Sequence, residues 1–168
     1  MNIFILDSDI KKSAKYHVDK HCVKMILEHC QMLCTALTLN SSLQQKLDII
    51  DIPYKKSHVN HPCTLWVSKN YDNFAWLVAY THELHEEYKY RYGRDHLSYI
   101  TLESKRIITQ HLIKYGRKLS ILNLSPACAM PDECKVGSVI DSYRNYYHMH
   151  KSHLFSWTKR NKPEWLSN

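Results

Sequence analysis

Apolar residues recur at helical spacing along most of this chain, and the pattern predicts helices rather than strands. The segments that carry this pattern run from about Ile10 or Ser13 to Leu39, from Cys63 to Tyr92, from His96 to Leu119, and from Val139 to His150. The chain has only three glycines, which favours helices and leaves no room for a glycine-rich phosphate loop. We therefore predict a mostly α protein in which residues 1–168 form a single compact helical domain, with three or four main helices around a basic cleft.

The segments outside these helices are short or irregular. Asn2–Leu6 is a brief apolar run that fits either a strand or an N-terminal arm plugged into the core. A short amphipathic piece covers about Leu43 to Ile50, and Pro53–Pro62 is a basic loop expected on the surface near the mouth of the cleft. Gly93 is expected to end the second long helix as a left-handed glycine.

The first long helix has an unusual distribution of side chains between His17 and Leu39. At about 100° per residue, one narrow strip holds polar groups, while apolar residues and cysteines, Val23 among them, fill the rest of the circumference. The strip consists of His17, His21, Lys24, Glu28, Gln31 and Thr35. Such a helix is expected to be surrounded by protein on most sides, where ionisable groups cost free energy unless they bind a ligand or each other.

Within this strip, the strongest indication of a functional site is the group formed by Glu28, His21 and Lys24. Spacings of three, four and seven residues place them on neighbouring turns of one helix face. A carboxylate beside apolar walls can act as acid or base, and a neighbouring ammonium can hold it ionised. The structural alternative is a simple ion pair between Lys24 and Glu28.

Charge and cysteine content narrow the class of protein. Lys and Arg total 23 against 16 Asp and Glu, which gives a formal charge of +7. This charge favours an anionic partner, with nucleic acid first, and the alternative is that the charge serves solubility alone.

The six cysteines follow no recognisable signal peptide, so reduced and mostly buried thiols in an intracellular protein are expected. No apolar stretch approaches the ~20 residues needed to span a bilayer, so no membrane partner is expected. These patterns leave the oligomeric state open.

Metal binding is a further possibility because His17 and His21 have the spacing of zinc ligands on a helix. Neither the cysteine spacings nor this histidine pair match a zinc motif, so we expect no metal and no cofactor, and a zinc-dependent hydrolase is only a weak alternative.

Aromatic and cationic residues alternate near the end of the chain, in the segment VIDSYRNYYHMHK. Flat aromatic faces interleaved with cations are typical of a platform on which bases stack, although tyrosines at helical spacing are also typical of a core. With the strip and the end of the second long helix, this segment supplies the candidate substrate contacts: His17, Gln31, Arg91, Arg94, Tyr143, Arg144, Tyr146, Tyr147 and Lys151.

From Asp19-Lys20-His21 to Glu28, the sequence resembles the phage pyrimidine-dimer DNA glycosylase family, also called endonuclease V. That family has Asp-x-His on its first long helix, followed seven residues later by the catalytic glutamate, so Glu28 takes the place of that glutamate. Arg91-Tyr92-Gly93 and Tyr146-Tyr147 are weaker similarities. The chain also resembles a group of viral proteins with YHxDKHxVKM, MPDExKV and YRNYY motifs, to which we attach no chemistry.

The resemblance implies a helical domain that kinks DNA, flips a base and cleaves an N-glycosidic bond. In that family the N-terminal amine attacks the sugar C1′ to form an imine, and the glutamate assists before β-elimination breaks the strand. This chain departs from the family in its bulky second residue, Asn2, which indicates that Met1 is retained, and in Leu27 and Gln31, which replace family arginines. Either the Met1 amine still reaches the cleft, or Glu28 activates water, or, less favoured, Lys24 serves as the amine.

We therefore predict an intracellular DNA N-glycosylase or related base- or nucleotide-processing enzyme, located in the host cytoplasm if the protein is viral. Glu28 is the expected acid/base, His21 an orienting or proton-transfer partner, and Lys24 a phosphate contact. The alternative from another class is a protein that binds or sequesters a nucleotide or nucleic acid without turning it over.

Overall fold

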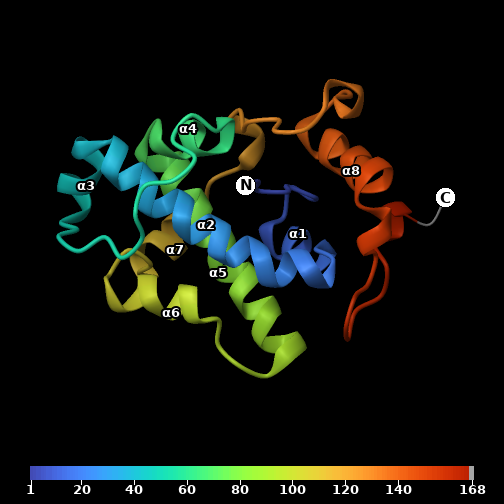
Figure 1. Cartoon of the computed structure of the whole chain (residues 1–168), viewed down its shortest axis with the longest axis horizontal. Coiled ribbons are helices and arrows are strands. Elements are labelled where there is room, and N and C mark those ends of the chain that lie inside the picture. The colour runs from blue at the N-terminus through green and yellow to red at the C-terminus, as the bar shows by residue number, and fades with distance from the viewer. Residues whose placement is uncertain (167–168) are drawn as a thin grey trace.

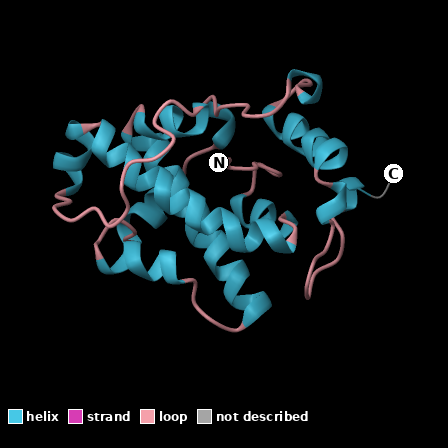
Figure 2. Cartoon of the chain, in the orientation of Figure 1, coloured by secondary structure: helices cyan, strands magenta, loops and turns pink. Residues whose placement is uncertain are grey.

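The computed structural model describes residues 1–166, and within them the regular structure is entirely helical, which confirms the predicted mostly α class (Figure 2). The α-helices are α1 (Ile10–Tyr16), α2 (Asp19–Leu39), α3 (Ser41–Leu47), α4 (Pro62–Ser68), α5 (Tyr71–Tyr92), α6 (Leu97–Ser104), α7 (Gln110–Gly116) and α8 (Val139–His150). Short 3₁₀ turns lie between α7 and α8 at η1 (Ile121–Asn123) and η2 (Asp132–Cys134), and after α8 at η3 (Ser152–Leu154) and η4 (Glu164–Leu166).

The fold is arranged around α2 and α5, which cross near the centre of the molecule (Figure 1). Helix α2 also packs against α4 and α6, and α5 packs against α1 and α7. Residues 2–6 form a buried, non-helical arm, and the N-terminus lies between α2 and α8 (Figure 1). Of the two forms the sequence allowed for Asn2–Leu6, the structure therefore adopts the plugged arm.

The first long helix was predicted as continuous, but it is broken at His17 and Val18, both of which have extended backbone. Arg91 of α5 explains the break. Its guanidinium donates hydrogen bonds to the carbonyl oxygens of Lys15 (2.9 Å) and His17 (2.9 Å), groups that the end of α1 leaves without helical partners. Because this donor is more than 70 residues away in sequence, local periodicity carries no sign of the break.

The second and third predicted helices are also divided. Asn70 separates α4 from α5 and caps α5, because its side chain accepts a hydrogen bond from the Asn73 amide (2.9 Å). The third helix is interrupted by Arg106, whose φ of +60° ends α6, and Thr109 then caps α7. Gly93 ends α5 in the left-handed conformation, as predicted.

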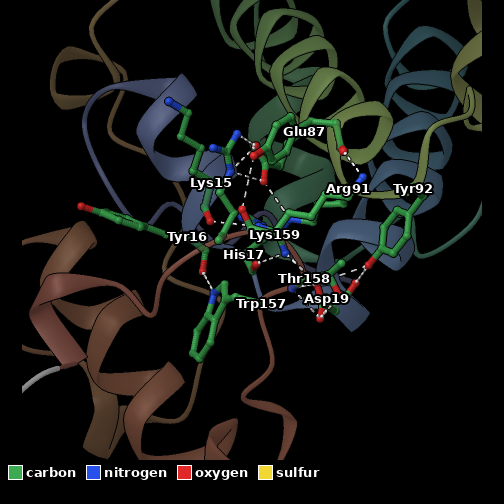
Figure 3. A network of polar contacts seen from close by, with 12 residues as sticks. Lys15, Tyr16, His17, Asp19, Glu87, Arg91, Tyr92, Trp157, Thr158 and Lys159 are labelled. Carbon is green, nitrogen blue, oxygen red and sulfur yellow. Dashed lines mark hydrogen bonds and ion pairs between the residues drawn. The ribbon is translucent and has the colours of Figure 1, made fainter.

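Helix α5 buries three charged residues, Glu83, Glu87 and Arg91. The Glu87 carboxylate is held by Arg91 (2.7 Å) and by Arg160 of the C-terminal segment (2.8 Å). Figure 3 shows this network, in which Asp19, at the start of α2, binds both Arg91 and the backbone amide of Thr158. The network fastens residues 156–160 across the junction of α1 and α2.

The surroundings of α2 agree with the prediction of a helix enclosed on most sides, although Val23 is 40% exposed rather than buried. All six cysteines are free thiols, and every one except Cys128 is buried. Among the described residues, none of the helices has the length and apolar character required to cross a membrane.

Candidate functional site

The N-terminal arm brings the beginning of the chain to Glu28. The α-amine of Met1 lies 3.7 Å from Glu28 Oε2, and the backbone amide of Asn2 donates a hydrogen bond to the same oxygen (2.9 Å). Glu28 is 8% exposed, so this carboxylate faces the arm in a largely dry setting. Imine formation needs a primary amine close to a group that can accept its proton, and the Met1 amine and the Glu28 carboxylate are two such groups.

Asn2 fixes this arrangement. Its side-chain amide donates to the carbonyl oxygen of Ala129 (2.7 Å), and its side-chain oxygen accepts from the amide of Ile3 (2.8 Å). The residue is 7% exposed. The bulky second residue therefore anchors the arm and leaves the α-amine facing Glu28.

Lys24 occupies the other side of the carboxylate. Its Nζ lies 3.3 Å from Glu28 Oε1, one helical turn away, and its side chain is 67% exposed. The structure thus brings together two members of the predicted catalytic group. An ammonium so open to solvent contributes little to stability through this pair, about 1 kcal/mol at most, and is free to contact an anion.

His21, the third member, makes its contacts in another direction. Its ring stacks on Phe4, with centroids 4.4 Å apart, and its Nδ1 lies 2.6 Å from the hydroxyl of Tyr147 on α8. Burial lowers the pKa of His21 to about 3, helped by the neighbouring His17. The imidazole is therefore neutral near pH 7, and it links Phe4 of the arm to Tyr147 of α8.

His17 lies deeper still. It is fully buried, its Nδ1 contacts the carbonyl oxygen of Ser13 (3.1 Å), and burial lowers its pKa to about 4. The rings of His17 and His21 are 6.4 Å apart and inclined at 68°. His17 Nε2 is buried without a hydrogen-bond partner, and the one group of three potential metal ligands found in the described chain includes neither histidine.

The tyrosines of α8 divide between the core and the surface. Tyr143 and Tyr147 are fully buried, and Tyr143 donates a hydrogen bond to the carbonyl oxygen of Ala127 (2.9 Å). Tyr146 is half-buried, lies against Phe4 with nearly parallel rings (5.9 Å) and carries the Lys151 ammonium 4.7 Å above its ring. Of the predicted platform, Tyr143 and Tyr147 thus belong to the core, whereas Arg144, Tyr146 and Lys151 are half-buried.

The remaining predicted contacts are dispersed. Arg91 is part of the buried network, and Arg144 donates to the carbonyl oxygen of Leu6 (2.8 Å) and pairs with Asp7 (3.1 Å). Gln31 is half-buried on α2, and Arg94 is exposed and donates to the hydroxyl of Tyr88 (3.1 Å). Their assignment as substrate contacts, and the basic cleft itself, stay predictions.

Sequence reasoning did not single out the start of α4, which borders the N-terminus. Thr64 places its hydroxyl 3.4 Å from Met1 Sδ, and His61 caps α4 by accepting a hydrogen bond from the amide of Cys63 (3.2 Å). Burial lowers the pKa of His61, and the charge of the Met1 amine lowers it further. The only sequence signal was the His61-Pro62 helix start, which carries no indication of what it faces.

Comparison with known proteins gives a family for this arrangement. A family model described as pyrimidine dimer DNA glycosylase matches residues 1–101, a segment that contains the N-terminal arm, Lys24 and Glu28 and ends within α6. Helix α8 lies outside the matched segment. Searches of curated proteins and of solved structures found no significant match.

Proposed function

The chain belongs to the pyrimidine dimer DNA glycosylase family, with DNA as its partner, and from this premise we propose that it cleaves an N-glycosidic bond with the α-amine of Met1 as nucleophile and Glu28 as acid/base. The observation that carries the proposal is the convergence of the α-amine and the Asn2 amide on one oxygen of Glu28. Without the arm in this place, Glu28 would have no amine nucleophile except Lys24.

The geometry suits each step of such a reaction. The amine must lose a proton before its lone pair attacks C1′, and the Glu28 carboxylate faces it at 3.7 Å. As the C1′–N bond breaks, the departing base takes up a proton, and the imine between the α-nitrogen and C1′ acidifies the proton on C2′. In this proposal Glu28 accepts that C2′ proton, after which the C3′–O bond breaks and the 3′ phosphate leaves.

Two lysines and one tyrosine near the arm supply contacts to DNA. Lys24 is open to solvent beside Glu28, and Tyr146 with Lys151 offers a ring face and a cation near Phe4. A base stacked on an aromatic ring gains ~1–3 kcal/mol, and phosphate contacts make the affinity depend on salt. We assign Lys24 and Lys151 to phosphates and Tyr146 to a base.

A second candidate is a protein on the same fold that binds DNA or a nucleotide without cleaving it. It is favoured by Leu27 and Gln31, which stand where the resemblance places family arginines. Such a protein would keep the DNA affinity expected from its charge and lose base excision.

Borohydride trapping on ultraviolet-irradiated duplex DNA tests the proposal. Reduction of an imine joins enzyme and DNA irreversibly, so the intact chain should give an adduct whose peptide map places DNA on the N-terminal peptide. Glu28→Gln removes the acid/base and should slow base excision by ~10²–10⁴-fold while DNA binding persists. Excision at an unchanged rate in Glu28→Gln would refute the assignment.

Two controls separate the nucleophile from the fold. Reductive methylation confined to the α-amine, or extension of the chain by a few residues before Met1, should abolish the adduct and leave the helical circular-dichroism spectrum unchanged. Glu103→Gln, which alters an exposed carboxylate on α6, should trap as the unaltered chain does. DNA binding without adduct or excision in the unaltered chain would favour the second candidate.

A further inference from the structure

A thiol, an imidazole and a carboxylate meet where η2 packs on α8. The ligand atoms of Glu133, Cys134 and His150 all lie within 4.8 Å of one another, and this is the one group of three such ligands found among residues 1–166. His150 Nε2 and Glu133 Oε1 are 3.3 Å apart. The cluster belongs to elements outside the segment that matches the family model.

One distance in the cluster, between the His150 nitrogen and the Glu133 oxygen, already matches a tetrahedral zinc site. Zinc binds imidazole nitrogen and carboxylate oxygen at about 2.0–2.2 Å and thiolate at about 2.3 Å, so neighbouring ligand atoms in a tetrahedron are ~3.3–3.6 Å apart. The nitrogen and oxygen already have this separation. The side chains of His150 and Glu133 are 39% and 56% exposed, so small rotations of these side chains bring them closer to the thiol.

The surroundings leave the ligand atoms available. The Cys134 side chain is buried, and its thiol contacts only the Met149 sulfur, at 3.9 Å, among hydrogen-bonding partners in the described chain. Asp132, the neighbouring carboxylate, is instead bound to Lys135 (2.7 Å). The Cys134 carbonyl oxygen accepts a hydrogen bond from Asn145 of α8 (3.3 Å), which holds η2 in place.

We propose that Glu133, Cys134 and His150 form a zinc site that fastens η2 to α8, with a water molecule or the Met149 thioether as fourth ligand. A cysteine thiol with an ordinary pKa is protonated near pH 7 in the absence of metal. Zinc binding therefore forms the Zn–S bond as the S–H proton passes to solvent, one proton for each ion bound.

The site has a structural consequence for the N-terminal arm. The segment leading into η2 supplies the carbonyl oxygens of Ala127 and Ala129, which hold Tyr143 and Asn2. A zinc ion that fixes the end of this segment stabilises the groups that anchor the arm. The metal acts on the fold and takes no part in the proposed chemistry at Glu28.

Zinc titration of the full chain, purified without a histidine tag and under reducing conditions, tests the site. We expect one Zn²⁺ per chain by native mass spectrometry, with a rise in Tm of about 5 °C at saturating zinc. Co²⁺ in place of zinc should give the sulfur-to-metal charge-transfer absorption of a thiolate ligand. The absence of a stoichiometric ion, or of the thiolate absorption, would overturn the proposal.

Matched variants assign the ligands. Cys134→Ser, His150→Ala and Glu133→Gln should each weaken zinc binding at least tenfold, and the last two alter exposed side chains that the fold does not need. Cys128→Ser in the same segment and His148→Ala on the same helix should bind zinc as the unaltered chain does. If these two control variants also bound zinc at least tenfold more weakly, the ion would have to lie elsewhere and the proposed site would be refuted.

Discussion

At the scale of single residues, two amines lie near the Glu28 carboxylate, and they differ in their exposure to solvent. The α-amine of Met1 belongs to a buried arm, whereas the Lys24 side chain is 67% exposed and reaches the carboxylate from solvent. A lysine becomes a good nucleophile when it is desolvated. Lys24 is not desolvated, so the proposed nucleophile is the α-amine.

Replacement of Lys24 by Met tests this distinction. Lys24→Met should retain the borohydride adduct and bind DNA more weakly, with a salt dependence reduced by about one phosphate contact. The measurement is trapping yield beside DNA affinity at several salt concentrations, with Lys24→Arg as the charge-preserving control. Complete loss of the adduct in both variants would identify Lys24 as the nucleophile.

At the scale of elements, the contact between α5 and α7 depends on Gly116. A Cβ at this position would collide with the carbonyl oxygen of Ala75 and lie 2.8 Å from the Cβ of Ala79. The glycine weakens the last turn of α7 in isolation. In the fold it is required, because it allows two helix backbones to approach closely.

Gly116→Ala should therefore destabilise the protein despite the higher helix propensity of alanine. Overpacking against the backbone of α5 is expected to cost ~1–3 kcal/mol of unfolding free energy, measured by urea denaturation. Lys114→Ala, an exposed change on the same helix, should alter stability by less than ~0.5 kcal/mol. A Gly116→Ala protein as stable as Lys114→Ala would contradict the close approach.

At the scale of the whole molecule, buried histidines link stability to pH. Burial lowers the pKa of His17 and His85 to about 4, and of His21 and His29 to about 3, from the ordinary 6.5. Below pH 6.5 the unfolded chain takes up protons at these sites while the folded chain does not. Stability is therefore greatest above pH 6.5 and falls as the pH drops toward 4.

Urea unfolding between pH 7.5 and 4.5 measures this effect. Each of the four histidines should remove up to about 1.4 kcal/mol of unfolding free energy per pH unit in the lower part of that range. Burial raises the pKa of the Asp19 and Glu87 carboxyl groups, but hydrogen bonds from Ser156 and Arg160 outweigh it and lower both pKa values. These two groups therefore add to the loss of stability as the pH falls below about 5. A flat profile from pH 6.5 to 4.5 would show that these histidines are not buried as described.

The sequence alone was sufficient to predict the helical class, the bounds of α8, the end of α5 at Gly93 and the pairing of Lys24 with Glu28. These features depend on hydrophobic periodicity, glycine conformation and i,i+4 spacing, all of which act within a few residues. The tertiary structure alone decided the break between α1 and α2, the inward turn of Tyr143 and Tyr147, the meeting of the α-amine with Glu28, and the cluster at η2 and α8. Asn2 illustrates the reason, because it donates hydrogen bonds to Glu28 and Ala129, which lie 26 and 127 residues away in the sequence. Such contacts exist only after the chain has folded, and no local pattern encodes them.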